Sequence, residues 1–361
     1  MKRLYIRMAV ALAAVLLAIA FGDAFLSKVS VQRGYDGTGM VLIKDKDDLT
    51  AISEKNVAPL VLPPAVGEGT KAAEAYKNVQ VLGGLTTSQF TRLMTSITMW
   101  VAPEQGCAYC HNTENLASDE LYTKVVSRRM FQMVQHINND WGAHVAQTGV
   151  TCYTCHRGKP VPEYIWFEQP EHPQAHRAVG NPMEQNMPGA LVGLTSLPTD
   201  SLSPFLVNSA GVRIVGTEAL PSGNRSSIKQ AEWTYGLMMH MSESLGVNCT
   251  YCHNTQAFAD WSKSPVARTT AWHGIQMARE LNNEFLLPLR DKYPANRLGV
   301  NGDPPKLNCQ TCHQGAYKPL LGLSLMKDYP SLSGPTPYVP PPVTETATTA
   351  ADQAEPAPEA M

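Results

Sequence analysis

Four copies of one short motif constrain this 361-residue chain more than any other feature. Each copy reads Cys-x-x-Cys-His, and together the copies use all eight cysteines, so that no cysteine is left over. The chain also has 27 prolines, 26 glycines and only 17% charged residues, which predicts a turn-rich protein that needs more than side chains in its core. The motif residues are Cys107, Cys110 and His111; Cys152, Cys155 and His156; Cys249, Cys252 and His253; and Cys309, Cys312 and His313.

The motif is the attachment sequence of c-type haem, in which both thiols form thioethers to the porphyrin and the histidine binds the iron. Disulfide frameworks, zinc ribbons and redox Cys-x-x-Cys sites would each leave some cysteine pair without a histidine behind it. Because every pair here has its histidine, the sequence predicts four covalently bound haem c groups. The eight cysteines are the expected thioether donors, and the four histidines are the expected proximal iron ligands.

The first 30 residues are predicted to form an export signal or a membrane anchor. Three basic residues, Lys2, Arg3 and Arg7, precede an uncharged run over residues 8–22. Haem c is attached outside the cytoplasm, so the chain must be exported. The uncharged run fits a cleavable signal peptide, whereas the 23 positions from Leu4 to Leu26 are long enough for a retained anchor. The residues alone leave both possibilities open.

The rest of the chain is predicted to be mainly α-helical with long ordered loops and to form two pseudo-symmetric dihaem halves. The halves cover residues 86–158, with the first two motifs, and residues 228–330, with the last two. Each half contains a methionine-bearing amphipathic stretch, a CxxCHN motif, a helix with Asn-Asn and a CxxCHxG motif, which indicates an internal duplication. The other predicted segments are an N-terminal loop segment over 31–85, a connector over 159–227 and a disordered tail rich in Pro and Ala over 331–361.

Each haem with one histidine ligand has a sixth iron position, which a Met or His fills when the haem transfers electrons rather than binding a substrate. We expect these ligands on helices beside the motifs, over residues 90–101, 122–145 and 230–245. Every methionine on these helices also fits a role as a flexible core residue. The candidate ligands are Met94, Met99, Met130, Met133, His136, His144, Met238, Met239, His240 and Met241.

The two halves do not offer matching ligands. When the Asn-Asn pairs are aligned, Met130 falls opposite Gly274 and His144 falls opposite Pro288. The second half therefore lacks counterparts of both residues. Either the fourth haem uses Met277, or the first half donates a ligand across the duplication, and the residues leave this choice open.

The chain resembles the tetrahaem cytochrome c subunit of bacterial photosynthetic reaction centres from about residue 31 to residue 329. The resemblance rests on the paired motifs, on the Asn-Asn helices and on the sequence Arg-Gly-Tyr-Asp-Gly-Thr-Gly-Met at residues 33–40. The family's spacing of distal ligands places them 13, 22 and 11 residues before the first cysteines of motifs one to three, and eight residues before the second motif. The resemblance thereby implies Met94, Met130 and Met238 for the first three haems and His144 for the fourth.

The resemblance implies an electron-transfer subunit rather than an enzyme. Such a subunit lies on the periplasmic face of the inner, photosynthetic membrane and re-reduces the photo-oxidised bacteriochlorophyll pair. Its expected partners are reaction-centre membrane subunits of the L, M and H types, contacted by residues 31–85, and a soluble cytochrome c or high-potential iron–sulfur protein. No nucleic acid is expected at a net charge of −2. Because no cysteine directly follows the apolar run, the resemblance also favours an uncleaved N-terminal helix as the anchor.

Two groups of charged residues are candidates for tuning this function. Acidic residues near the first motif, at Glu104, Glu114, Asp119 and Glu120, are candidates for steering a basic donor. Basic residues at Arg128, Arg129 and Arg268 are candidates for pairing with haem propionates. Both groups equally fit an ordinary solvated surface.

Two other functions fit part of the sequence. A multihaem reductase or peroxidase needs at least one haem with an open sixth site, and nothing distinguishes one motif from the others. A membrane-anchored periplasmic cytochrome that passes electrons from quinol to a respiratory reductase fits the four motifs and the anchor. The ligand spacing and the segment over residues 33–40 favour the photosynthetic subunit over this alternative.

Overall fold

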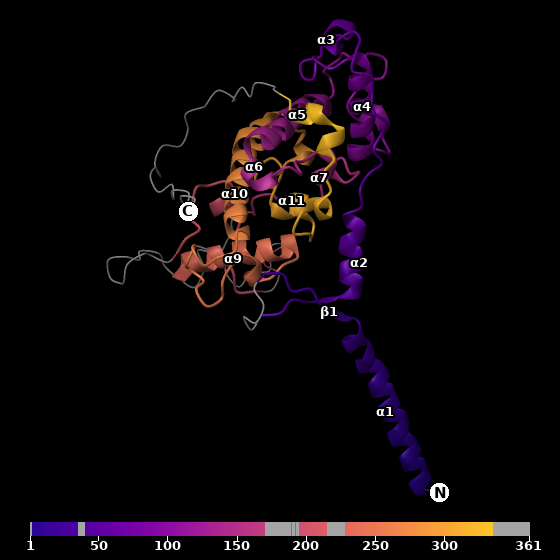
Figure 1. The fold of residues 1–361 in the computed structure, drawn as a ribbon, viewed down its shortest axis with the longest axis vertical. Coiled ribbons are helices and arrows are strands. Elements are labelled where there is room, and N and C mark those ends of the chain that lie inside the picture. Colours follow the sequence, from indigo (N-terminus) through magenta and orange to yellow (C-terminus); the bar gives the residue numbers. More distant parts are fainter. Residues whose placement is uncertain are drawn as a thin grey trace, which may run out of the picture.

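The computed structural model describes residues 2–34, 40–169, 189, 192, 195–214 and 228–334, and these residues form a mainly helical protein (Figure 1). One antiparallel strand pair accompanies the helices, β1 (Lys28–Ser30) with β2 (Ile43–Asp45). The α-helices of the described residues are α1 (Lys2–Leu26), α2 (Lys46–Lys55), α3 (Ala72–Ala75), α4 (Thr87–Val101), α5 (Tyr122–Asp140), α6 (Gly142–Val145), α7 (Cys152–His156), α8 (Ser203–Leu206), α9 (Ile228–Leu245), α10 (Ala267–Glu280) and α11 (Cys309–His313).

The N-terminal helix α1 projects away from the body of the protein (Figure 1). Its residues 2–22 have a mean hydropathy of 2.3, and none of them is buried inside the protein. At 1.5 Å per residue, the 25 residues of α1 reach about 37 Å, which exceeds the ~30 Å hydrocarbon core of a bilayer. Among the described residues, α1 alone is long and apolar enough to cross a membrane.

Residues before the first motif and residues after the fourth motif pack together in one core. Helix α4 begins with a capping box between Thr86 and Gln89, which satisfies free N–H groups of its first turn. Further along α4, the buried Trp100 packs edge-on against Tyr329, with ring centroids 4.7 Å apart. The Tyr329 hydroxyl lies 2.8 Å from Ser96 Oγ, so the residues that follow the fourth motif close the core of the first half.

The second predicted helix differs from the structure in one respect. A continuous helix was expected over residues 122–145, but α5 ends at Asp140 and a separate short helix, α6, follows. The break lies at Trp141, whose φ of −104° and ψ of 32° are outside the helical range. Because of this break, His144 on α6 lies against α10, where its ring nitrogen Nδ1 is 2.9 Å from the carbonyl oxygen of Thr270.

Two asparagines, the part-buried Asn138 and the buried Asn282, hold the second and fourth motifs in the same way. Asn138 on α5 donates to the carbonyl of Val150 and accepts from its N–H, at 2.9 and 2.7 Å. Asn282, in the π-helical turn Leu281–Leu286 that continues α10, makes the same pair of bonds to Leu307, at 3.0 and 2.9 Å. Val150 and Leu307 each stand two residues before the first cysteine of a motif, so each asparagine fixes where its motif begins.

Several predicted segments lie wholly or partly outside the described residues. These are the glycine-containing stretch at 35–39, most of the connector over 159–227 and nearly all of the tail over 331–361. The described part of the connector packs into the core, where Leu202, Phe205 and Leu206 are almost completely buried. Asn282 also donates to the Leu206 carbonyl at 2.9 Å, so this part of the connector is tied to the second Asn-Asn helix.

Replacing Asn282 with leucine is expected to destabilise the protein. The substitution leaves the N–H of Leu307 and the carbonyl of Leu206 buried without partners. It also removes one of the two hydrogen bonds to the Leu307 carbonyl, which keeps its bond from Trp166 Nε1. We expect the free energy of unfolding to fall by about 2–4 kcal/mol, measured by calorimetric melting of the intact protein. Asn301, an exposed asparagine with one bond to the Gln169 carbonyl, provides the matched control as Asn301→Ala. Equal shifts in melting temperature for the two variants would contradict the structural role of Asn282.

Candidate functional site

The four Cys-x-x-Cys-His motifs adopt two local conformations that alternate along the chain. The first and third form short 3-10 turns, Gly106–Tyr109 and Cys249–Tyr251. The second and fourth form the short helices α7 and α11, which both begin with a capping box. Both helices end in a left-handed residue, Arg157 at φ 51° and Gln314 at φ 48°, followed by a glycine that also has positive φ. The glycine in CxxCHxG therefore serves the sharp turn that ends each of these helices.

Every motif histidine places its ring nitrogen Nδ1 on a backbone carbonyl of its own loop. His111 and His253 use the carbonyls five residues later, Leu116 and Phe258, at 3.1 and 3.3 Å. A carbonyl can only accept, so Nδ1 carries the proton in each ring and Nε2 keeps a free lone pair. This is the tautomer in which a histidine presents Nε2 to a metal.

The other two motif histidines use the carbonyls three residues later and are more deeply buried. His156 donates to the Lys159 carbonyl and His313 to the Ala316 carbonyl, both at 2.9 Å. Burial lowers the pKa of His156, and it lowers the pKa of His313 to about 4. Both rings are therefore neutral near pH 7, which is the form that binds iron.

A single cavity of about 920 Å³ contains the predicted haem residues of the first half. This volume is at the upper end of the range for ligand pockets in proteins, and apolar side chains dominate the lining. Both predicted methionine ligands face the same cavity as the histidines with which they are expected to pair. The predicted haem residues on its wall are Met94, Cys107, Cys110, His111, Met130, Cys152, Cys155 and His156.

The fourth motif receives a second histidine from the first half of the chain. The rings of His144 and His313 are T-shaped, with centroids 6.0 Å apart. A metal–imidazole bond is about 2 Å, so two histidines on opposite sides of one metal ion place their centroids roughly 6 Å apart. His144 also donates from Nδ1, to the Thr270 carbonyl, and burial lowers its pKa. The donor set and spacing at this site fit a haem iron with two imidazole ligands.

The sequence also offered Met277 as the ligand for the fourth haem. Met277 on α10 is partly buried and packs against the hydrophobic core. Another candidate, His136, contacts Asp140 and Glu280, with 2.5 Å between its Nδ1 and the Asp140 Oδ2. These contacts place His136 between α5 and α10, where it joins the two halves.

The third motif is held by the N-terminal segment, a role that sequence patterns did not reveal. Asn248, next to Cys249, donates to Gln32 Oε1 at 2.8 Å, and Thr250 donates to the Arg33 carbonyl at 3.2 Å. Gly34 has φ of 100°, and a Cβ there would lie 2.0 Å from the Thr250 carbonyl oxygen. Only glycine allows the chain to pass so close to the motif. The predicted ligand Met238 lies on α9, the helix that leads into this motif.

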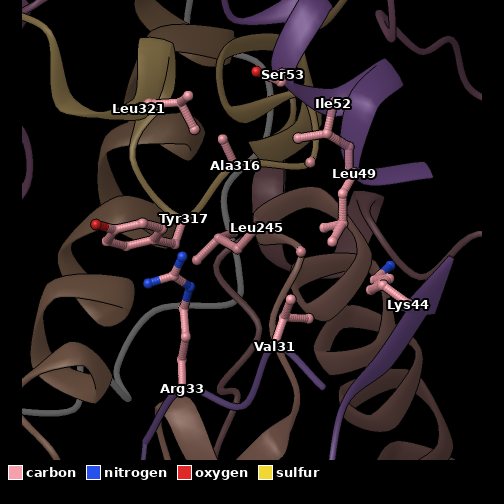
Figure 2. A pocket seen from close by; sticks show the side chains of 12 residues that line it. Val31, Arg33, Lys44, Leu49, Ile52, Ser53, Leu245, Ala316, Tyr317 and Leu321 are labelled. Carbon is pink, nitrogen blue, oxygen red and sulfur yellow. The ribbon is translucent and has the colours of Figure 1, made fainter. Parts of the chain in front are cut away.

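Figure 2 shows a small cavity of about 140 Å³ beside this N-terminal segment. The guanidinium of Arg33 stacks against the ring of Tyr317, 4.2 Å from its centroid. Leu49 and Ile52 of α2 line the same cavity as Leu245 at the end of α9. Residues from the segment predicted to contact the reaction centre therefore also pack on the end of α9, before the third motif, and on the loop that follows the fourth motif.

Four of the motif cysteines, each partly shielded from solvent, have thiols that are held protonated rather than activated. Burial raises the pKa of Cys152 to about 12 and that of Cys110, Cys252 and Cys309 to about 11. Redox-active and zinc-binding cysteines need the opposite shift, because the thiolate is their reactive form. No group of three or more His, Cys, Asp or Glu side chains suited to a metal ion occurs in the described part of the chain.

The second cysteines of the second and fourth motifs lie side by side. The structure joins Cys155 and Cys312 by a disulfide, and their Cα atoms are 4.4 Å apart. A sulfur in a disulfide cannot also form a thioether, so this bond conflicts with the expectation that both cysteines attach haem. The two uses of Cys155 and Cys312 predict different masses for the mature protein.

The charged candidates divide into paired and exposed groups. Arg128 makes a two-pronged ion pair with Asp119, at 2.8 and 2.9 Å, and Lys124 lies 3.2 Å from the same carboxylate. These partners, Arg128 foremost, hold the pKa of Asp119 far below its usual range. The negative charge of Asp119 is thus already balanced by Arg128 and Lys124. Glu104 and Glu114, by contrast, are exposed near the first motif.

The arginine candidates have different surroundings. Arg129 contacts the Glu284 carbonyl and stacks 4.4 Å from the ring centroid of Phe285, so it links the halves. Arg268 lies over Trp261 and donates to the Phe258 carbonyl, which is also the acceptor for His253. Arg297 was not singled out from the sequence, yet it lines the large cavity beside the hydroxyls of Tyr122 and Tyr109. No local motif marks it, because its position depends on the packing of the two halves.

Comparison with known proteins gives one consistent family. The family model described as photosynthetic reaction centre cytochrome C subunit matches residues 26–333. The photosynthetic reaction center cytochrome c subunit of Rubrivivax gelatinosus (strain NBRC 100245 / IL144) is 55% identical over 306 residues, which cover 84% of this chain and 83% of that protein. The protein of the same description from Thermochromatium tepidum is 50% identical, over 83% of this chain and 74% of its own length. That from Roseobacter denitrificans (strain ATCC 33942 / OCh 114) is 43% identical, over 84% and 85%.

Proposed function

The chain belongs to the family of photosynthetic reaction centre cytochrome c subunits, and on this premise we propose that it re-reduces the photo-oxidised bacteriochlorophyll pair with electrons from a soluble periplasmic donor. The observation that carries the proposal is the pairing of His144 with His313. An iron bound on both sides by protein ligands has no free position for a substrate and is suited to electron transfer. The subunit is thus an electron carrier rather than an enzyme.

We assign four haem c groups to the chain, in two pseudo-symmetric dihaem halves. Membership of the family implies covalently bound haem c, and four motifs provide the attachment sites. Three repeated features support the two halves: the alternating motif conformations, the two sets of histidine–carbonyl bonds, and the matched clamps of Asn138 and Asn282. When bound, the haems supply the reversible one-electron chemistry of their irons.

The protein residues set the potentials of these groups. We assign Met94, Met130 and Met238 as the distal ligands for the first three motifs and His144 as that for the fourth. The thioether of methionine is a weaker donor than imidazole, so His/Met ligation gives a higher potential than His/His ligation. Arg297 and Arg268 place positive charge beside the first cavity and the third motif, which favours the reduced state further.

The order of the elements in space supports a linear arrangement of the haems. In Figure 1, α9, which precedes the third motif, lies at about the height of α2, at the end of the body toward β1 and α1. Helices α11 and α7 lie farther from α1, and α3 is at the far end. If α1 marks the membrane side, the third motif is nearest to the membrane and the first lies toward the far end. The expected order from the pigment pair is then third, fourth, second and first.

Family membership implies association with the membrane subunits of the reaction centre, for which we assign the L, M and H types. We assign α1 as an uncleaved anchor that places the body on the periplasmic face, with the basic residues before the span in the cytoplasm. A soluble cytochrome c or high-potential iron–sulfur protein is the assigned donor. Its docking site is the exposed surface around the first motif, where Cys107, Glu104 and Glu114 are all exposed.

Flash spectroscopy tests electron donation directly. In native membranes poised so that the haems are reduced, a single actinic flash should bleach the c-type α band as the bacteriochlorophyll signal recovers. We expect the haem band to bleach at the same rate as the bacteriochlorophyll signal recovers, because one electron passes from the haem to the pigment pair. A flash that oxidises the pigment pair in membranes containing this protein, without oxidising any of its haem, would contradict the proposal and favour the respiratory alternative.

Intact-protein mass spectrometry tests the count of four haems and the state of Cys155 and Cys312. We expect a mass increase of four haem groups and no cysteine that reacts with an alkylating reagent after denaturation and reduction. If the disulfide is the native state, reduction instead releases two alkylatable thiols and fewer than four haems have both thioethers. The control is Cys312→Ser, which should leave the haem of the fourth motif with a single thioether.

His144→Met tests the ligand assignment. Replacing imidazole with a thioether should raise the midpoint potential of one low-potential haem by roughly 0.1–0.3 V, part of the ~0.8 V range that axial ligands span. Redox titration of the α band should show the other three haems nearly unchanged. Met277→Leu is the matched control and should leave all four potentials in place. The opposite pattern would mean that Met277, not His144, is the ligand.

A further inference from the structure

Gly274 occupies the middle of helix α10, a position where glycine is unfavourable because it adds backbone freedom to the unfolded chain. A glycine inside a helix therefore calls for a packing reason. The structure provides one, because a Cβ at position 274 would lie 2.6 Å from Cε1 and 2.9 Å from Nδ1 of His144. The imidazole of His144 fills the space that any other side chain at this position would occupy.

The missing side chain also exposes a hydrogen-bond acceptor. A helical side chain covers the turn that precedes its own Cα, so a side chain at position 274 would lie over the turn that contains Thr270. The Thr270 carbonyl is instead open, and His144 Nδ1 donates to it at 2.9 Å. This bond fixes the tautomer of His144, with the proton on Nδ1 and the lone pair of Nε2 free. The ring then meets that of His313, at the centroid distance of 6.0 Å.

The duplication shows what stands at the same place in the first half. With the Asn-Asn pairs aligned, Gly274 corresponds to Met130, which lines the large cavity with His156. His144 corresponds to Pro288, whose side chain has no atom that can bind a metal. The helix of the first half thus carries a methionine where the helix of the second half carries a space for a histidine from the other half. The glycine at position 274 and the histidine at position 144 therefore depend on each other.

We infer that Gly274 is a positioning residue that selects the distal ligand of the fourth haem. By lacking a side chain, it admits His144 from the first half in place of a methionine from α10. This inference rests on the proposed four-haem function. In this role Gly274 acts on the fourth haem only through His144.

The first test is a stability cycle with Gly274→Ala, His144→Ala and the double variant. In the presence of His144, the added methyl group cannot fit, so Gly274→Ala should lower the melting temperature of the protein. In the His144→Ala background, the same change should be neutral or stabilising, because alanine favours a helix over glycine. If Gly274→Ala is equally destabilising in both backgrounds, or prevents assembly in both, the inference is overturned.

The second test examines the ligation of the fourth haem by electron paramagnetic resonance of the oxidised complex and by redox titration. Gly274→Ala should abolish the low-spin signal of the bis-imidazole haem and shift the potential of that one haem upward. The matched control is Gly236→Ala in α9, where a Cβ would lie 2.1 Å from Ser201 Oγ and is equally crowded. This control should lower the melting temperature yet leave the bis-imidazole signal in place. A bis-imidazole signal that survives Gly274→Ala would overturn the inference.

A third variant tests for a gain of ligation. Gly274→Met combined with His144→Ala places a methionine where the first half has Met130. Because three haems already have assigned methionine ligands, we expect the methionine-to-iron charge-transfer band to be stronger than in the single variant His144→Ala. Four retained haems with no increase in this band would overturn the ligand-selecting role. The single variant His144→Ala separates the two proposals. If it leaves the bis-imidazole signal intact, the ligand assignment under the proposed function has failed; if it removes the signal while Gly274→Ala does not, only the inference on Gly274 has failed.

Discussion

The hydrogen bond from each motif histidine to a backbone carbonyl of its own loop determines much of the remaining structure. It fixes the ring tautomer and the direction of Nε2 before any distant residue is considered. The distal ligands that we propose come from helices beside the motifs, so the positions of these helices relative to the motifs matter. Helices α4 and α9 lead into the first and third motifs. Asn138 on α5 and Asn282 in the π-helical turn that continues α10 position the second and fourth motifs.

The two halves are not separate units, because one hydrophobic core contains residues of both. His136 of α5 contacts Glu280 of α10, and Arg129 stacks on Phe285. These two contacts join the Asn-Asn helices of the two halves. Tyr329 returns from the end of the second half to pack on Trp100 in the first. A shared, close-packed core resists changes in the distance between the motifs. Fixed distances are what a chain of electron carriers requires.

The sequence predicted the helical class and the family because both depend on local patterns, namely motif spacing and the Asn-Asn repeat, and both are confirmed. It also located α4 and α9 to within a few residues. It did not predict the break at Trp141, the contacts of Gln32 and Gly34 with the third motif, or the position of Arg297 in the large cavity. These features arise from contacts between distant segments, which no local pattern encodes. The distal ligands remain predictions.

A symmetric duplication would give the second and fourth haems the same ligands and similar potentials. The change from methionine to glycine at position 274 breaks this symmetry on α10, and the break at Trp141 turns α6 so that His144 enters the space. Neither change is useful alone: the glycine without the histidine leaves a void beside α10, and the histidine without the glycine clashes with the helix. Under the ligand set proposed above, the two changes together give one haem a lower potential, while its motif keeps the same local conformation as the second motif. The proposed series of potentials is then uneven because of a contact between the two halves, not because of a change within a motif.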